Sequence, residues 1–154
     1  MNCNYTVEKD WITKSGLRAV CVHFHNMHRC GYVGVDKKHC LYGLEYSDPI
    51  PASLLDRWEK IKNEPAGKRS FIDMLIGAMD KTGSVSLFFD VHGGITYSKD
   101  SSQSYPVESD NTWWFGFDCA HANDDNISQE YVEAECESFA EQLASIGKQE
   151  IDNK

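Results

Sequence analysis

The sequence has few basic residues for its size. Its 154 residues include 15 Lys and Arg against 24 Asp and Glu, a formal net charge of −9 at pH 7, and the basic residues form no cluster. Proteins that bind nucleic acids or anionic membranes usually present a basic face. We therefore expect no DNA, RNA or membrane partner, whereas a local basic spot would still suit a small anion.

Two kinds of apolar segment are also missing. The N-terminal stretch is polar and lacks the apolar core of a signal peptide, and no run approaches the roughly 20 apolar residues that cross a bilayer. These absences predict a protein of the cytoplasm. The six cysteines include no CxxC pair, so in that reducing compartment we expect free thiols, without disulfides and without a zinc knuckle.

The chain does contain enough apolar material for one core. Hydrophobic residues make up 41% of the chain and aromatic residues 12%, with neither an internal repeat nor a low-complexity stretch. A chain of this length is typical of one domain. We therefore expect a single globular domain over residues 1–154, with a mobile tail after Gly147, a natural helix stop.

Hydrophobic periodicity predicts the secondary structure. Apolar runs predict strands at 17–24, 29–35, 85–91 and 113–119, and a short strand or helical turn near the N-terminus. Helical spacing predicts helices over about 54–61, about 70–79 and about 128–146; the second of these should face the core with Phe71, Ile72, Leu75, Ile76 and Met79. Strands, two helices, strands and one helix, in that order, predict an α+β fold: a largely antiparallel sheet with about three helices packed on one face.

The stretch 84–125 concentrates the reactive side chains. Strand alternation places Phe88, Asp90 and His92 on one face of the run 85–91, and Phe115, Phe117, Cys119 and His121 on one face of the other run. Both runs become polar at their C-terminal ends, where they carry Asp90, His92, Asp118, Cys119 and His121. Simple strand ends in solvent are the alternative to a site.

Gly93 and Gly94 interrupt the first of these runs. Two adjacent glycines in a β-forming stretch predict a hairpin or sharp corner, with a positive φ or a close approach of another backbone or a ligand. We expect Asp90, His92, Cys119 and His121 to line one cavity.

The loop 36–48 should supply the third wall of that cavity. It carries His39, Tyr42 and Tyr46, and a loop of this kind is either a pocket wall or lid or is pinned to the core by its aromatic residues. The polar segment 99–111 is expected to be a solvated loop or a flap beside the site. The ligand-binding residues that we predict are His39, Tyr42, Tyr46, His92, Gly93, Gly94, Thr96, Trp114, Asp118 and His121.

A second group of histidines and cysteines lies in the N-terminal third. Its composition resembles a metal cluster, but the usual zinc spacings are absent, and a strand with a polar edge explains the group equally well. We predict no metal and no cofactor. The residues of this group are Cys21, His23, His25, His28 and Cys30.

Four blocks of the sequence are distinctive in combination: CGYVGV at 30–35, HCLYG at 39–43, VHGGITYS at 91–98 and WWFGFDCAHANDD at 113–125. Together they resemble a family of small uncharacterised bacteriophage and prophage proteins. The resemblance covers 30–46 and 90–125, roughly half the chain, and this sequence has Cys40 where the family pattern has Pro. The resemblance implies a phage origin and a host-cytoplasm setting, and it supplies no reaction.

Three functions fit these residues. The first, which we favour, is a small-molecule binding protein that captures a host nucleotide immune signal, because glycine amides and histidines suit a phosphate and aromatic rings stack on a base. The ligand would be anionic or a nucleotide, and a homo-oligomer stays open. The function that we rank last is an acidic inhibitor of a host protein, which would use the outer face of the last helix, at Glu130, Glu133, Glu135, Glu137 and Glu141.

The second function is a hydrolase or transferase that acts on a small phosphorylated substrate. Cys119 would be the nucleophile, His92 or His121 the base, and Asp90 or Asp118 the group that orients the base. A variant is metal-assisted hydrolysis, with a ligand set of Asp90, His92, Asp118 and His121. No spacing matches a known catalytic signature, so the sequence alone leaves open whether the protein is an enzyme.

Overall fold

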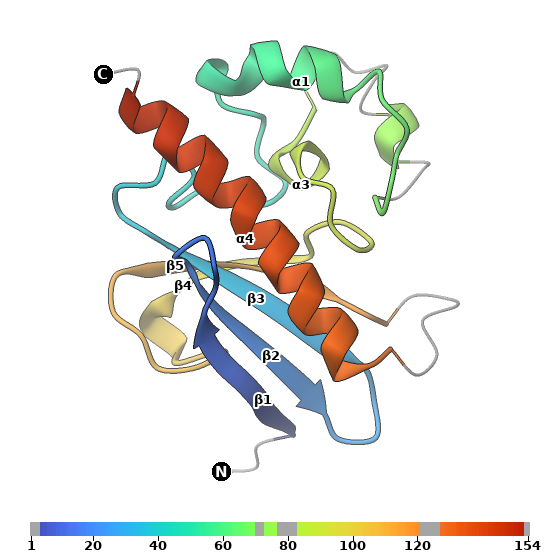
Figure 1. Cartoon of the computed structure of the whole chain (residues 1–154), viewed down its shortest axis with the longest axis vertical. Coiled ribbons are helices and arrows are strands. Elements are labelled where there is room, and N and C mark those ends of the chain that lie inside the picture. Colours follow the sequence, from blue (N-terminus) through green and yellow to red (C-terminus); the bar gives the residue numbers. More distant parts are fainter. Residues whose placement is uncertain (1–3, 70–72, 77–82, 121–126, 153–154) are drawn as a thin grey trace.

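The computed structural model describes residues 4–69, 73–76, 83–120 and 127–152. Its centre is a five-stranded antiparallel sheet in the order β1-β2-β3-β5-β4. The long helix α4 lies diagonally across one face of the sheet (Figure 1). The α+β prediction is confirmed. The strands are β1 (Tyr5–Ile12), β2 (Arg18–Phe24), β3 (Arg29–Asp36), β4 (Tyr97–Asp100) and β5 (Thr112–Asp118).

The helices divide into two groups. α4 (Gln129–Asp152) packs on β2 and β3, whereas the shorter helices lie past the end of the sheet, beside the C-terminal half of α4 (Figure 1). Within the described ranges, α4 is thus the helix that lies against the face of the sheet. The short helices are η1 (Ala52–Leu54), α1 (Leu55–Ile61) and α3 (Val85–Phe88), and η2 (Ser101–Gln103) follows β4. No helix in the described ranges has the length and apolarity of a membrane span.

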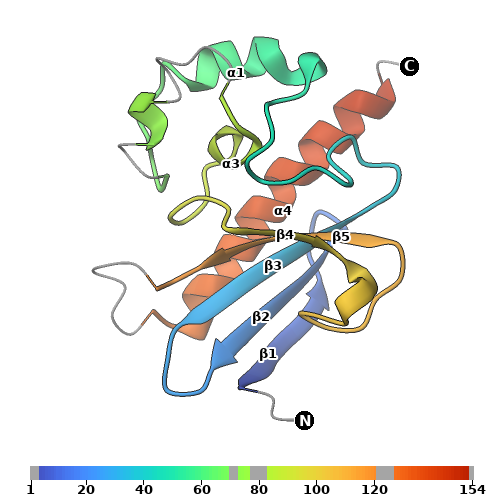
Figure 2. The same cartoon turned by 180° about the vertical axis from the view of Figure 1, so that it is seen from behind.

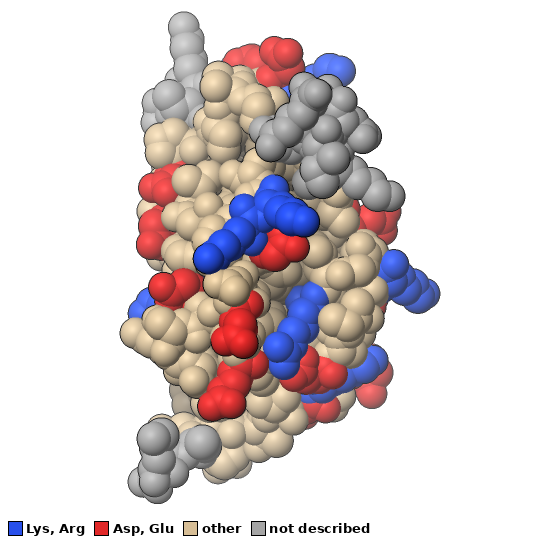
Figure 3. All heavy atoms as spheres, turned by 90° about the vertical axis from the view of Figure 1, so that its left-hand side faces the viewer, with Lys and Arg blue, Asp and Glu red and all other residues tan. Residues whose placement is uncertain are grey.

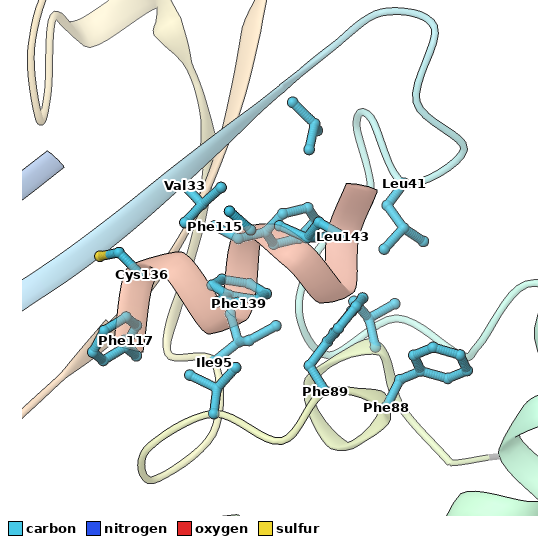
Figure 4. Packing of buried hydrophobic residues seen from close by; sticks show 14 of the residues in the cluster. Val33, Leu41, Phe88, Phe89, Ile95, Phe115, Phe117, Cys136, Phe139 and Leu143 are labelled. Atoms are coloured by element: carbon cyan, nitrogen blue, oxygen red, sulfur yellow. The ribbon is translucent and has the colours of Figure 1, made fainter. Parts of the chain in front are cut away.

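The core lies between the sheet and α4. Alternation along the strands places Ala19 and Cys21 of β2, and Phe115 and Phe117 of β5, on the α4 side. They meet the buried stripe of α4, which recurs every three or four residues as the sequence predicts. Figure 4 shows Cys136, Phe139 and other side chains of this cluster packed together. The stripe consists of Val132, Cys136, Phe139, Leu143 and Ile146.

A second, smaller core covers the opposite face of the sheet. There Val20, Val22 and Trp114 are fully buried, and the Tyr32 and Tyr105 hydroxyls share a hydrogen bond of 2.6 Å. The segment 101–111 that carries Tyr105 lies over the strands on this side (Figure 2). The predicted solvated loop is therefore wrong for its aromatic part, because Tyr105 and its neighbours shield apolar strand residues from water.

The predicted strand over 85–91 is also wrong: Val85–Phe88 is the short helix α3. Its backbone finds hydrogen-bond partners without a neighbouring strand. Val85 N–H donates to Asp48 O, Arg69 donates to the carbonyls of Leu87 and Phe88, and both Val85 and Phe88 are buried. Packing and satisfied backbone groups outweigh the β propensity of the run.

Two helix predictions need a smaller correction. In the helical turn at 73–76, Met74 is buried, whereas Leu75 and Ile76 are 54% and 58% exposed. Of these described residues, Met74 is the one that faces the core. Phe71, Ile72 and Met79 lie outside the described residues. The last helix continues past Gly147 to Asp152, because an interior glycine costs a helix only about 1 kcal/mol relative to alanine.

Candidate functional site

Of the predicted site residues at the end of β5, Cys119 is buried and Asp118 is half-buried. Cys119 is 2% exposed and belongs to the main core, where its backbone N–H donates to Arg29 O. The Asp118 carboxylate accepts from the Thr96 hydroxyl at 3.0 Å and from Ala120 N–H at 3.2 Å. His121 lies outside the described residues. A substrate would not reach the Cys119 thiol in this packing.

Cys21, Cys30 and Cys136 are buried as well, whereas Cys40 is half-buried. Burial is the main cause that raises the pKa of Cys21 and of Cys30 to about 12 in each case. Thiols with such a pKa are poor nucleophiles at neutral pH. The cysteines in the described ranges are all free thiols; these residues are Cys21, Cys30, Cys40, Cys119 and Cys136.

Asp90 and His92 form part of a clasp between α4 and the segment 66–69. Lys68 N–H donates to Asp90 Oδ1 at 2.7 Å, and Lys68 Nζ donates to Glu135 Oε1 at 2.8 Å. Glu135, 6% exposed, also accepts from His92 N–H at 2.8 Å through its other oxygen. The His92 Nδ1 atom and the Tyr131 hydroxyl share a hydrogen bond of 2.9 Å. These contacts fix the main chain just before the two glycines.

The glycine pair has the backbone that the sequence predicts. Gly93 has φ +67° and Gly94 φ +87°, in the region that non-glycine residues enter at a cost of about 1–2 kcal/mol. Both amides are occupied within the protein: Gly93 N–H donates to Lys68 O at 2.8 Å, and Gly94 N–H donates to Val91 O at 2.9 Å. The corner is therefore a closed structural turn.

We expect Gly94→Ala to lower the free energy of unfolding by about 1–2 kcal/mol, because alanine would adopt an unfavourable positive φ. The new Cβ would also lie 3.3 Å from Ser86 Oγ. Urea denaturation of this variant, with Lys99→Ala on exposed β4 as the control, measures the loss. Gly93→Ala should behave similarly, and full stability in both glycine variants would contradict the assignment.

The loop 36–48 combines the two alternatives that the sequence left open. His39 and Tyr42 pin it to the core: His39 accepts Leu41 N–H at Nδ1 and donates from Nε2 to Leu143 O of α4 at 2.8 Å, and the Tyr42 ring packs against Trp113. Tyr46, farther along, lines a cavity. Trp114 is fully buried on the far face of the sheet, where its indole N–H donates to Ser109 Oγ.

The cavity has a volume of about 550 Å³, within the range of small-molecule sites. Four short segments contribute to it: the end of the loop 36–48, the turn at 73–76, the residues around α3, and the strand-like stretch after the glycine corner. Three of the predicted ligand residues meet here, whereas Asp90, His92 and Cys119 do not line it. The lining of the cavity includes Tyr46, Ser47, Ser84, Ser86, Gly93 and Thr96.

Hydrogen bonds hold the wall that carries Tyr46. Tyr46 N–H donates to Ser98 Oγ at 2.9 Å, and the buried Ser98 hydroxyl donates to Glu45 Oε2 at 2.8 Å. On the other side, Ser86 N–H of α3 donates to Tyr46 O at 2.9 Å. The loop is thus attached both to β4 and to α3. A wall held at two points is preorganised for binding, because little entropy is lost when a ligand arrives.

No local pattern in the sequence indicates several of the lining residues. Ser86 falls in the run 85–91 that predicts a strand, with Ser84 directly before it, and Ile76 belongs to the stripe predicted to face the core, with Asp73 on the same predicted helix. They reach the cavity because the segment 85–88 is helical and the turn 73–76 buries Met74 instead. Only the observed backbone conformation reveals them.

The His and Cys residues of the N-terminal third do not converge. His23 lies 3.8 Å from Glu8 and contacts Met27 O, His25 bonds to Thr6, and the His28 ring packs near Phe24. Across the described part of the chain, no group of three or more His, Cys, Asp or Glu side chains has a metal-binding arrangement. These histidines belong to a polar strand edge and its turn.

Much of the acidic face of α4 is used within the molecule. Glu133 pairs with Lys9 at 3.1 Å, Glu135 with Lys68, and Glu137 accepts from the Trp11 indole and from Lys14 N–H. On the face in Figure 3, Lys and Arg side chains lie among Asp and Glu side chains rather than apart from them. An acidic mimic of nucleic acid needs carboxylates that point outward, so this arrangement gives the inhibitor hypothesis little support.

Comparisons of the chain with protein-family models, with curated proteins and with solved structures found no match. Function is therefore argued from the cavity and its surroundings.

Proposed function

We propose that this protein is a small-molecule binding protein, and that its ligand occupies the cavity between the Tyr46 loop, α3 and the glycine corner. The observation that carries the proposal is a cavity of about 550 Å³ whose Tyr46 wall is hydrogen-bonded to two separate elements. In the setting that the sequence suggests, a phage protein in the host cytoplasm would use this cavity to capture a host nucleotide signal.

Binding fits the cavity better than catalysis does. None of its described lining residues is a histidine or cysteine, the side chains that most often act as general bases and nucleophiles. The predicted nucleophile, Cys119, is buried in the main core, and the Asp90 carboxylate holds the main chain of Lys68. A protein that sequesters its ligand needs a shaped, preorganised pocket and no reactive group.

We expect Tyr46→Ala to weaken ligand binding by at least about fivefold, because an aromatic ring stacked on a planar ligand contributes about 1–3 kcal/mol. The matched control is Tyr42→Ala, on the same loop but packed against Trp113 outside the cavity; its binding should change less than twofold. Binding is measured by calorimetry against a panel of ribonucleosides, hexoses and choline, each beside its monophosphate.

Amide chemical shifts locate the bound compound. Binding in the cavity should move the resonances of Ser84, Gly93 and Thr96, and the compound should be recovered unmodified after the protein is denatured. If no compound of the panel moves these resonances, or if binding is equally affected by both tyrosine variants, the proposal fails. Recovery of a chemically altered compound would show that the protein is an enzyme and would contradict the proposal.

A further inference from the structure

We infer that the cavity accepts a neutral or positively charged, hydrogen-bonding molecule of nucleoside size, and that its described lining provides no site for a phosphate. This inference rests on the proposed function and specifies the chemistry of the ligand. A nucleotide would bind through its base and ribose, with its phosphate outside the cavity.

Charge is the first argument. The described lining residues include no Lys, Arg or His, and the one charged side chain among them is the carboxylate of Asp73. A phosphate in the cavity would add to this negative charge, in a protein whose net charge is already −9. Two negative charges within one cavity repel each other strongly when solvent does not screen them. Phosphate sites built from side chains normally supply arginine or lysine.

The backbone amides give a second, independent argument. A phosphate can be held without a cation when several main-chain N–H groups point at it. Here the amides of the glycine corner and of the stretch after it donate within the protein: Gly93 to Lys68 O, Ile95 to Ser86 Oγ, and Thr96 to Gly116 O, at 2.8, 3.2 and 2.8 Å. Those of Val85 and Ser86 donate to the carbonyls of the Tyr46 loop. The glycine corner therefore does not form an anion cradle.

The groups that remain suit an uncharged polar molecule. Ser84 does not cap α3 with its side chain, and its hydroxyl and that of Ser47 lie in the lining. Hydroxyl groups both donate and accept, so they match bases, sugars and amines. Ile76 and Leu87 supply apolar wall, and Tyr46 supplies an aromatic ring. This mixture of apolar surface and few polar groups is typical of sites for small organic ligands.

The calorimetric panel of ribonucleosides, hexoses and choline, each paired with its monophosphate, tests the inference. In the wild-type protein, at least one unphosphorylated compound should bind in a Tyr46-dependent manner, and its monophosphate should bind no tighter. A monophosphate that binds ten times tighter than its partner would overturn the inference and leave the proposed function intact. If no compound of either kind binds in the cavity, the proposed function fails, and the inference fails with it.

A charge introduced at the cavity provides the complementary test. Ile76 lines the cavity and is 58% exposed, whereas its neighbour Leu75 is 54% exposed and does not line it. Ile76→Lys should therefore improve the binding of the monophosphate relative to its unphosphorylated partner about tenfold, and Leu75→Lys should change this ratio less than twofold. Equal effects of the two lysines would show that the ligand does not sit beside Ile76, and this would overturn the inference.

Discussion

Glu135→Ala is expected to lower the free energy of unfolding by about 2–3 kcal/mol. The Glu135 carboxylate is buried and accepts from two donors, Lys68 Nζ and His92 N–H, both at 2.8 Å. Alanine would leave the His92 amide without its acceptor, and a buried polar group without a partner costs about 1–3 kcal/mol. The Lys68 ammonium group is half-exposed and is hydrated in the variant. Breaking its ion pair therefore costs less stability than breaking a fully buried pair.

Glu133→Ala is the matched control for this variant. Glu133 lies on the same helix and pairs with Lys9, whose side chain is exposed, so its removal should cost under about 1 kcal/mol. Both variants remove one negative charge from a chain of net charge −9, so the effect of net charge on stability is the same in both and cancels in the comparison. Urea unfolding curves of the two proteins measure the difference. An equal loss in both would show that the clasp of Lys68, Glu135 and His92 does not stabilise the fold.

Gly31→Ala is expected to be similarly damaging, by about 2–3 kcal/mol. Gly31 of β3 lies directly opposite Phe117 of β5, and the Phe117 ring covers it beneath α4. A Cβ at this position would lie 2.5 Å from Phe117 Cζ and 2.8 Å from Cys136 Sγ. These atoms are buried, so the ring or the helix must shift. Such overpacking of a core typically costs about 1–3 kcal/mol.

A double-mutant cycle checks the cause of this loss. Phe117→Leu alone should also destabilise, because it removes a ring from the core. In the double variant, however, the smaller leucine should leave room for the alanine methyl. The combined loss should therefore be smaller than the sum of the two single losses by at least about 0.5 kcal/mol, as is found for residues in direct contact. Strict additivity would contradict the proposed clash.

The sequence by itself determined the elements that carry a long, regular pattern. β2, β3 and β5 are apolar runs of seven or eight residues that are buried on both faces of the sheet, and α4 repeats its buried residues through five positions. In such elements the local preference of the run agrees with the burial that it finds, so the pattern predicts the conformation. The positive φ of Gly93 and Gly94 was predictable for a similar reason, because few conformations other than a sharp turn favour two glycines.

Only the tertiary structure decided the short elements and the composition of the site. The run 85–91 has the composition of a strand, yet Val85–Phe88 is helical because Asp48, Arg69 and the buried surroundings satisfy it in that form. Short segments have weak intrinsic preferences, and packing overrides them easily.

The candidate site shows the same division. Of the predicted ligand residues, Tyr46, Gly93 and Thr96 meet at the cavity, whereas His39 and Trp114 hold other parts of the fold. Residue type indicates what a side chain is able to do, but the partner that it finds depends on which segments come together in space. The hydrogen bonds from His39 to Leu143 O and from Gly93 N–H to Lys68 O are long-range contacts, and no local pattern in the sequence encodes them.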